Sequence, residues 1–213
     1  KLALGWAAWK TYLGRPDTDM VRCMGIGVLG DALRASSRAE EALPVLEAGL
    51  ALGRRHWPHG EQAILVVQNN IAICLSGLAR YDEALALRRN LYARFAAILG
   101  VSDEKTIVSG SNLATSLIHL ELWDEAKTIL RDQLLPMARQ SLGRDHETCL
   151  ALGHRMAEAL VGHPNANDED RTQAEMILQD VVQRRRRVLG PAHPRTQTRQ
   201  GGVTVQPTYK NDP

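Results

Sequence analysis

Three groups of residues in this sequence have types and spacing that could support chemistry. The segment Gly25–Gly30 fits the G-x-G-x-x-G pattern of dinucleotide-binding turns. Seven histidines could bind a metal or act as general bases, and Arg184–Arg187 could contact a phosphate or an acidic partner. Each of these chemistries requires particular surroundings, so the surroundings decide whether it is available.

The glycine pattern lacks the surroundings of a cofactor site. A dinucleotide site needs a strand before the first glycine and a helix that begins at the turn, so that the helix amides meet the pyrophosphate. Here Asp17–Asp19 supplies helix-capping residues upstream, which places Gly25–Gly30 in the middle of a helix. We therefore expect these small residues to serve a close helix crossing, and we expect no cofactor.

The histidines and cysteines do not have metal-ligand spacing. There is no H-E-x-x-H motif, and Cys23, Cys74 and Cys149 never form a C-x-x-C pair. Free, buried, reduced thiols are the simplest interpretation, and they favour an intracellular, cytoplasmic setting. Because the sequence also contains no P-loop, G-x-S-x-G or paired-acid motif, we expect no enzyme.

The charged residues are balanced, with 26 Lys and Arg against 24 Asp and Glu spread along the chain. Such a balance predicts neither nucleic-acid binding nor attraction to a membrane surface. The side chains of Arg184–Arg187 would fan over more than one helical turn, which is typical of a solvated outer face, with contact to an acidic partner as the lesser alternative. No apolar stretch reaches the roughly 20 residues that span a bilayer, so we expect no membrane insertion.

An internal repeat organises the chain. Three similar segments end in Ala42, Ala84 and Ala126, which are 42 residues apart. A second marker, an apolar residue followed by Gly or Pro, recurs at spacings of 44, 42, 43 and 47 residues. It stands at Leu13–Gly14, Trp57–Pro58, Leu99–Gly100, Leu142–Gly143 and Leu189–Gly190.

Each repeat has the pattern of two helices. Apolar residues recur with i, i+3, i+4 spacing, and small residues stand where the two helices would cross. The sequence therefore predicts an all-α fold of tandem helix-turn-helix repeats stacked into a right-handed superhelical solenoid. We expect a second helix of a preceding repeat or a capping helix at 1–17, then four hairpins at 18–60, 61–102, 103–144 and 145–192. The start of a next unit up to residue 200 and an unstructured tail at 201–213 would follow, as in a piece of a longer array.

The repeat motifs resemble a known family. The order N-x-A, then [Y/W]-D-E-A, then L-G-x-x-H-P-x-T is similar to the 42-residue tetratricopeptide repeats of kinesin light chains. The similarity is best in Asn70–Gly100, Asn112–Thr148 and Arg187–Thr196, and it covers about residues 18–197. The repeat signature is specific for the fold and much less specific for the protein.

The resemblance implies a set of partner-binding residues. In such repeats the first helix of each hairpin lines a concave groove, and an Asn before the packed apolar-small pair commonly bonds the backbone of a bound peptide. The matching residues here are Asn70 and Asn112, while Arg155 and Val28 depart from the pattern. By the same register, the other groove residues would be Asp31, Arg34, Asn69, Ser76, Ser111, Thr115, His119, His154 and Glu158. The alternative is that the two Asn residues bond a neighbouring helix and only fix the stacking.

The function that follows is a scaffold that binds a protein or peptide segment in its concave groove. One alternative is a regulatory or sensor array of a larger enzyme or nucleotide switch. Another is an architectural subunit of a large assembly, in which the tail around Val203–Val205 could fill the groove. The sequence indicates neither the partner nor its charge.

Overall fold

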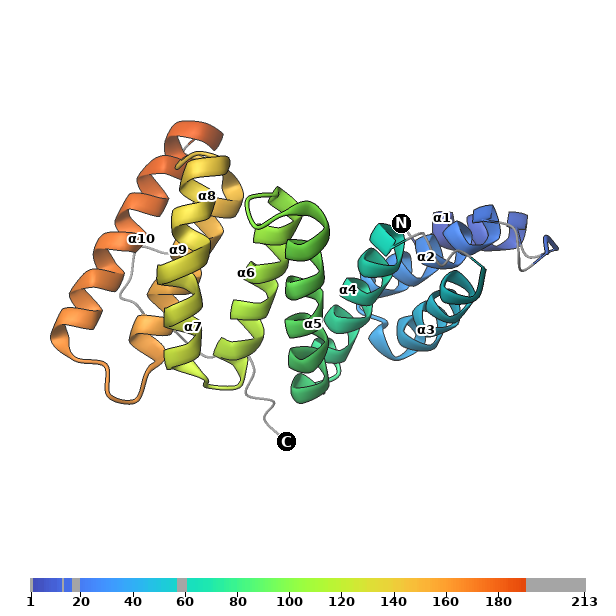
Figure 1. Ribbon diagram of the computed structural model, residues 1–213, viewed down its shortest axis with the longest axis horizontal. Helices are drawn as coiled ribbons and strands as arrows, with labels where there is room; N and C mark the ends of the chain where they lie inside the picture. The colour runs from blue at the N-terminus through green and yellow to red at the C-terminus, as the bar shows by residue number, and fades with distance from the viewer. Residues whose placement is uncertain (1, 13, 17–19, 57–60, 191–213) are drawn as a thin grey trace. The chain divides into compact units, whose positions relative to one another are not determined.

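The fold is built from helices and short turns, as the computed structural model in Figure 1 shows. The structure describes residues 2–12, 14–16, 20–56 and 61–190, with the side chains of Tyr12, Met20 and Cys23 excepted. Four features expected above lie outside the described residues: the cap at 17–19, the marker at 57–58, the start of a next unit and the tail at 201–213. The chain forms two compact units, Lys1–Phe95 and Ala96–Pro213, and each is described by itself.

Unit 1 contains helices α1 to α4 and most of α5. Each helix packs on the next as far as α4, and α2 also touches α4, so that two hairpins stack side by side. The buried core includes Leu29, Leu33, Leu46 and Leu75. The helices are α1 (Leu2–Tyr12), α2 (Met20–Arg34), α3 (Ala39–His56), α4 (Glu61–Gly77) and α5 (Tyr81–Leu99).

Unit 2 is organised around α9, which packs against α6, α7, α8 and α10. Leu117, Leu130, Leu134 and Leu152 are fully buried in it. The helices are α6 (Glu104–His119), α7 (Trp123–Ile129), the π-helical turn η1 (Leu130–Leu134), α8 (Leu135–Ser141), α9 (Glu147–Gly162) and α10 (Asp168–Leu189). The described part of the chain contains no strand, and the expected all-α fold of tandem helical hairpins is confirmed.

The turns inside three hairpins share one backbone geometry. Ser37, Ala79 and Glu121, which are 42 residues apart, have φ angles of 59°, 57° and 58°. In each turn the N–H of the next residue donates to the carbonyl oxygen five residues back, at 2.9 to 3.1 Å, which closes the end of the first helix. A left-handed conformation is unfavourable for these side chains, so the turn persists because both flanking helices are packed.

A π-helical turn accounts for one irregular spacing of the repeat. Leu142–Gly143 follows Leu99–Gly100 by 43 residues, one more than the 42-residue period. The extra residue is absorbed at η1, where the wider turn keeps both Leu130 and Leu134 fully buried. The insertion thus changes the local helical pitch and preserves the apolar contacts on both sides of it.

One glycine of the pattern, Gly30, stands at a close helix crossing, as expected, whereas a Cβ on Gly27 would meet nothing within 4 Å. All three glycines lie inside α2, and a Cβ built on Gly30 would come within 2.4 Å of Leu46 Cδ2 on α3. On the other flank of α2, a Cβ on Gly5 of α1 would lie 2.6 Å from the Ala32 Cβ. The alanines expected at the hairpin crossings, Ala84 and Ala126 among them, are also fully buried.

The expectation for the arginine run was wrong for two of its four residues. The Arg184 side chain is only 19% exposed, and it bonds Asp145 at 2.9 Å and Asp180 at 2.8 Å. The Arg185 side chain is 12% exposed and bonds Glu147 at 3.1 Å. The pairs with Asp145 and Glu147 join α10 to the turn before α9 and to the first residue of α9, whereas the pair with Asp180 lies within α10. Arg186 and Arg187 are exposed, as expected.

Candidate partner-binding face

The first helix of each hairpin has a stripe of polar and partly accessible residues, which we call its A-helix face. The A-helix face of unit 1 comes from α2 and α4, and that of unit 2 comes from α6 and α9, which touch each other within their unit. The residues expected along the groove, with Arg155 at the matching place of the fourth hairpin, all lie on these four helices. They are Asp31, Arg34, Asn69, Asn70, Ser76, Ser111, Asn112, Thr115, His119, His154, Arg155 and Glu158.

Unit 1 brings three of the expected residues together. Asn70 on α4 is 8% exposed, and its Nδ2 donates to Asp31 Oδ1 on α2 at 2.5 Å. Arg34, one turn further along α2, has its Nε 3.9 Å from the same Asp31 oxygen. The hydrogen bond between Asn70 and Asp31 joins two A helices, so Asn70 contributes to helix stacking, as the alternative interpretation predicted. Asn70 also lies among the residues expected to bind a partner.

Burial sets the electrostatics of this cluster. It raises the pKa of Asp31 above the ordinary value, and the nearby Arg34 offsets only part of the effect. Burial likewise raises the pKa of the Cys74 thiol, which lies behind the cluster and is 1% exposed. Cys74 is therefore a structural thiol, and the polar chemistry of the cluster rests on Asp31, Arg34 and Asn70.

A cavity of about 320 Å³ adjoins the cluster. Asp31 and Arg34 form its polar wall, and Leu4 and Val28 form much of its apolar wall. The Leu4 side chain is 73% exposed and that of Val28 is 49% exposed, which leaves apolar surface open to a partner. The cavity therefore combines apolar area with a few fixed polar groups, as ligand sites usually do.

The A-helix face of unit 2 is more polar than that of unit 1. Arg155 Nη1 donates to Glu158 Oε2 at 2.9 Å along α9, and both residues are half-buried. On α6 the Thr115 hydroxyl donates to the Ser111 carbonyl oxygen at 3.0 Å. The hydroxyl hydrogen is thus used within the helix, which leaves Thr115 an acceptor for any bound segment.

His154 adds a titratable group to the unit 2 face. Burial lowers the pKa of its imidazole, and the Glu158 carboxylate partly opposes that effect. Its buried Nδ1 has no hydrogen-bond partner among the described residues. The ring is therefore favoured in its neutral form inside this face.

The other expected residues differ in exposure. Asn69, Ser111 and Asn112 are half-buried, whereas His119 is exposed at the last turn of α6. The sequence analysis did not identify another set of corresponding positions on the A helices, which are Met24, Val66 and Val108. These side chains are 62%, 50% and 39% exposed, and they stand 42 residues apart. Exposed apolar residues at the repeat period were the signal that could have revealed them.

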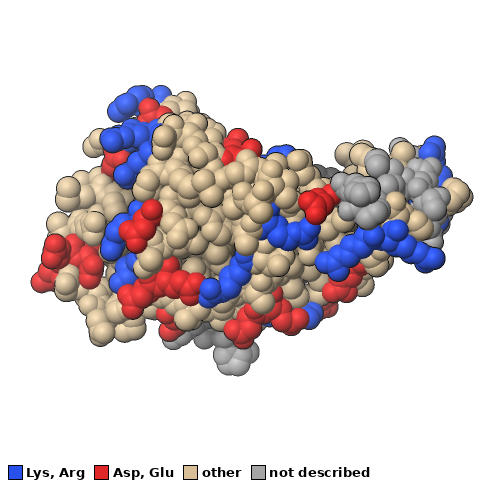
Figure 2. Space-filling view, viewed as in Figure 1, with Lys and Arg blue, Asp and Glu red and all other residues tan. Residues whose placement is uncertain are grey.

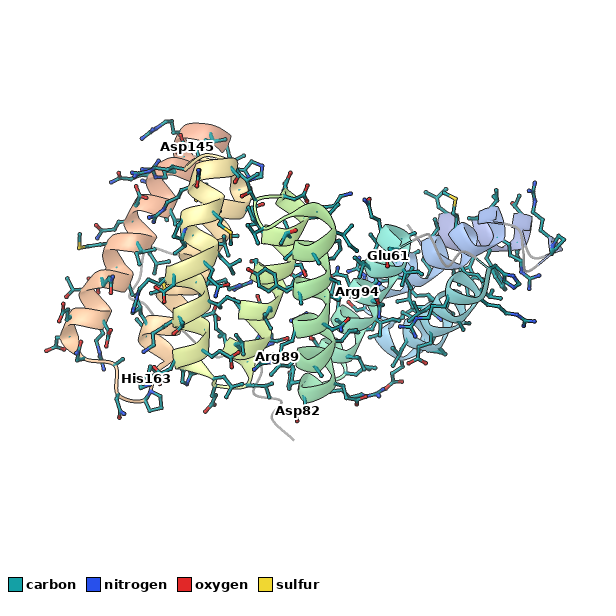
Figure 3. The ribbon with its side chains drawn as sticks, in the orientation of Figure 1. Glu61, Asp82, Arg89, Arg94, Asp145 and His163 are labelled. Atoms are coloured by element: carbon teal, nitrogen blue, oxygen red, sulfur yellow. The ribbon has the colours of Figure 1, made fainter. Side chains whose placement is uncertain are left out.

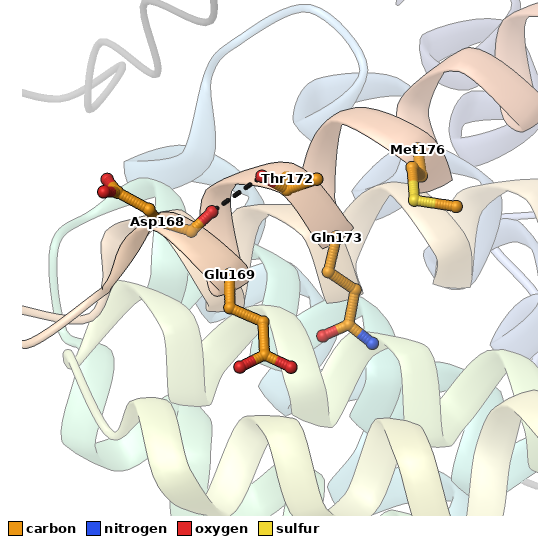
Figure 4. A pocket seen from close by; sticks show the side chains of 5 residues that line it. All are labelled: Asp168, Glu169, Thr172, Gln173 and Met176. Carbon is orange, nitrogen blue, oxygen red and sulfur yellow. Dashed lines mark hydrogen bonds between the residues drawn. The ribbon is translucent and has the colours of Figure 1, made fainter.

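A hollow on unit 2 lies away from these residues. It has a volume of about 560 Å³ and is formed at the start of α10 by Asp168, Glu169, Thr172, Gln173 and Met176 (Figure 4). Thr172 bonds the carbonyl oxygen of Asp168 at 2.8 Å. The hollow is open and includes none of the residues expected to bind a partner.

On the face drawn in Figure 2, basic and acidic side chains lie interspersed, so charge does not single out one region of that face. Many of them are paired locally, as in the bidentate Arg38–Glu41 and Arg80–Glu83 contacts. Within the described ranges, no three His, Cys, Asp or Glu side chains gather closely enough to hold a metal ion, and no helix is long and apolar enough to cross a membrane.

Comparison with known proteins identifies the architecture. The family model described as Tetratricopeptide repeat matches residues 166–195. The fold is also similar to the TPR-like repeats of a predicted kinesin light chain from Podosopora anserina, in a point variant and in a second crystal structure. The TM-scores are 0.72 and 0.70 at 20% identity, over 88% of this chain and 86% of the other. This chain has the fold of kinesin-light-chain-like tetratricopeptide repeats.

A further structural match is BtubC (BKLC) from P. vanneervenii, with a TM-score of 0.60 and 14% identity over 94% of both chains. No curated protein matches the sequence. Tetratricopeptide repeats generally mediate protein–protein interactions, because stacked hairpins form an extended, rigid surface. The A-helix faces described above are the candidate surfaces for an interaction of this kind.

Proposed function

We propose that this protein is a scaffold that binds a segment of a partner protein along the A-helix faces of its tetratricopeptide repeats, in the concave groove that such repeats form. The observation that carries the proposal is the exposure of Met24, Val66 and Val108, which hold corresponding positions on three A helices, with Asn70 and Asn112 one turn after Val66 and Val108. Apolar area supplies affinity, and amides and carboxylates supply direction.

Apolar and polar positions alternate along the A-helix faces, which favours a partner that binds as a single segment over a partner that binds through a large flat surface. An extended or helical segment would meet one apolar and one polar position in each repeat. Because the A helices are fixed by their buried crossings, the surface is formed before binding, which lowers the entropic cost of association. A regulatory array of a larger protein would use the same faces, so this proposal concerns the binding step itself.

Site-specific photocrosslinking tests the proposal. A photoreactive amino acid placed at Val66 or Val108 should capture a partner from native lysate. The same residue at Ala86, an exposed position on the second helix of its hairpin, should not capture that partner. Adding Asn70→Ala and Asn112→Ala should weaken the capture while leaving the circular dichroism spectrum unchanged.

Two outcomes would contradict the proposal. Equal capture at Ala86 and Val66 would move the contact to another surface and favour an architectural subunit. Full capture by the double Asn variant would show that the two amides serve only the stacking of the helices.

A further inference from the structure

The polar cluster of unit 1 has unused hydrogen-bonding capacity. Asp31 Oδ1 accepts from Asn70, while Asp31 Oδ2 has no hydrogen bond to a described residue. Arg34 also makes no hydrogen bond within the described part of the chain, and its Nε is buried without a partner. Its contact with Asp31 at 3.9 Å is too long for a hydrogen bond.

The two groups are open to the same cavity. The Asp31 side chain is 47% exposed and that of Arg34 is 30% exposed, and both line the space beside Leu4 and Val28. One acceptor and one set of donors therefore stand next to each other at the edge of apolar surface. A ligand that offers both a donor and an acceptor would satisfy both groups.

The charges of the pair select against an ionic ligand. The carboxylate and the guanidinium are adjacent, so an acidic group drawn to Arg34 would be repelled by Asp31. A basic group would meet the opposite conflict. A neutral group with a strong dipole suffers neither penalty.

The positions of the donor and the acceptor narrow the chemical class of the ligand further. In a trans peptide bond the N–H and the C=O point to opposite edges of the plane, so one peptide group cannot face both residues from the same side. In a primary carboxamide one N–H lies on the same edge as the oxygen, and the nitrogen and oxygen are about 2.3 Å apart. That group can pair with an acceptor and a donor at once where the two stand next to each other, as Asp31 and Arg34 do on α2.

We propose that Asp31 and Arg34 bind the side-chain carboxamide of an Asn or Gln residue in the partner segment, with a neighbouring apolar side chain of that segment against Leu4 and Val28. Asp31 accepts from the carboxamide N–H, and Arg34 donates to its oxygen. This inference rests on the proposed function and names the ligand chemistry that the unit 1 face would recognise.

Asn70 acts as a positioning residue in this arrangement. By occupying Asp31 Oδ1 from the neighbouring helix, it fixes the rotamer of the carboxylate and leaves Oδ2 for the ligand. Burial already raises the pKa of Asp31, so ionised Asp31 is costly in the empty site. A bound N–H would offset that cost.

The test is a methyl-NMR titration of the full chain with small probes that share one apolar tail. Isovaleramide, isovalerate, isoamylamine and N-methylisovaleramide present a primary amide, an acid, an amine and a peptide-like amide. Isovaleramide should shift the Leu4 and Val28 methyl signals saturably and bind about tenfold more tightly than the other three probes, as one charge-assisted hydrogen bond allows.

Variants assign the selectivity to the two residues. Arg34→Met keeps the apolar stem and should remove the preference for isovaleramide, as should Asp31→Asn, which is isosteric. Arg38→Met provides the control, because Arg38 pairs with Glu41 outside the cavity and its loss should leave the preference unchanged.

Each other result would overturn the inference. Tighter binding of isovalerate would mean that the cluster recognises acids, and tighter binding of N-methylisovaleramide would mean that it reads the peptide backbone. Equal or undetectable binding of all probes would mean that Asp31 and Arg34 serve folding alone. If photocrosslinks still form at Val66 when any of these results is found, the proposed function stands and only the proposed ligand chemistry is wrong.

Discussion

The A-helix face of unit 1 exposes Met24 and Val28 around a single ion pair, whereas that of unit 2 presents Thr115, Arg155 and Glu158 along the same helical stripe. Val28 corresponds to Arg155, and Asp31 to Thr115 and Glu158, through the 42- and 43-residue spacings of the repeat, so the repeat places them alike in both units. Their chemistry differs because exposed positions are free to change without loss of packing. The repeat register therefore determines where a partner can bind, and the individual side chains determine what is bound.

The two units also differ in how their helices are held. Unit 1 uses glycines at close crossings, with Gly5 against α2 and Gly30 against α3. Unit 2 also has a close glycine contact, with Gly162 against Trp123, and adds the buried leucines of the π-helical turn and the ion pairs of Arg184 and Arg185. Both units should therefore be sensitive to added volume, and unit 2 also to loss of charge. Four experiments test this comparison, from the largest expected effect to the smallest.

Overfilling a hairpin crossing should have the largest effect in both units. Ala84→Trp and Ala126→Trp place a large ring at fully buried positions, and each should cost about 1–3 kcal/mol or more. Ala86→Trp, at an exposed position of the same helix as Ala84, should cost far less. Urea denaturation followed by circular dichroism measures the three free energies of unfolding. Equal stability of all three variants would contradict the crossing positions.

A pair of glycine substitutions in α2 should have opposite signs. Gly30→Ala should destabilise unit 1 by about 1–3 kcal/mol, because its Cβ would overlap the buried Leu46 side chain. Gly27→Ala meets nothing within 4 Å and should stabilise the helix by about 0.5–1 kcal/mol. Thermal and urea unfolding of both variants measures the difference. Stabilisation by Gly30→Ala would refute the close contact of α2 with α3.

The pH dependence of stability should differ in sign between the two faces. Because burial raises the pKa of Asp31, its contribution to stability is present below the ordinary value of 3.8 and is lost as the pH rises through the raised pKa. Because burial lowers the pKa of His154, its contribution is present above 6.5 and is lost as the pH falls toward the lowered pKa. Arg34 faces Asp31, while Glu158, Arg155 and Arg185 surround His154.

Two variants separate these contributions. Asp31→Asn should gain stability relative to wild type between pH 3 and pH 7. His154→Gln should gain stability relative to wild type as the pH falls from 8 to 5. Urea denaturation over this range provides the measurement. If the free energy of unfolding of both variants changes with pH in parallel with that of wild type, neither group titrates with an altered pKa.

The ion pairs should give the smallest effects, with unit 2 the more sensitive. Arg184→Met loses bonds to Asp145 and Asp180 from a side chain that is 19% exposed, and should cost about 1 kcal/mol. Arg94→Met loses one longer contact with Glu61, at 3.4 Å (Figure 3), and should cost less than about 0.5 kcal/mol. The difference should shrink in 1 M NaCl. A larger cost for Arg94→Met would reverse the comparison.

Helix order and type could be predicted from the sequence because the apolar pattern repeats with the period of the fold. Gly100, for example, ends α5 with a φ of 88°, and Asp103 caps α6 by accepting from the Lys105 N–H, as their residue types suggest. The left-handed turns at Ser37, Ala79 and Glu121 could not be predicted, since no residue type there favours that conformation. The same holds for the π-helical turn, which the sequence showed only as one extra residue.

The candidate face was only partly predictable. The resemblance to known repeats selected Asn70 and Asn112 but could not indicate that Asn70 bonds Asp31, because those residues lie 39 positions apart and meet through the packing of α4 on α2. The exposed residues Met24 and Val66 were missed because an apolar residue in a helix pattern is usually assigned to the core.

By itself, the sequence determined the all-α repeat fold, the helix crossings at small residues and the absence of a dinucleotide turn in Gly25–Gly30, because each follows from local spacing and residue size. The tertiary structure alone decided which arginines are paired within the protein and which are exposed. It also decided that Asp31, Arg34 and Asn70 share one cluster beside an apolar cavity. Such contacts depend on how helices distant in sequence are rotated against each other, and that rotation is set by the packing of the whole core.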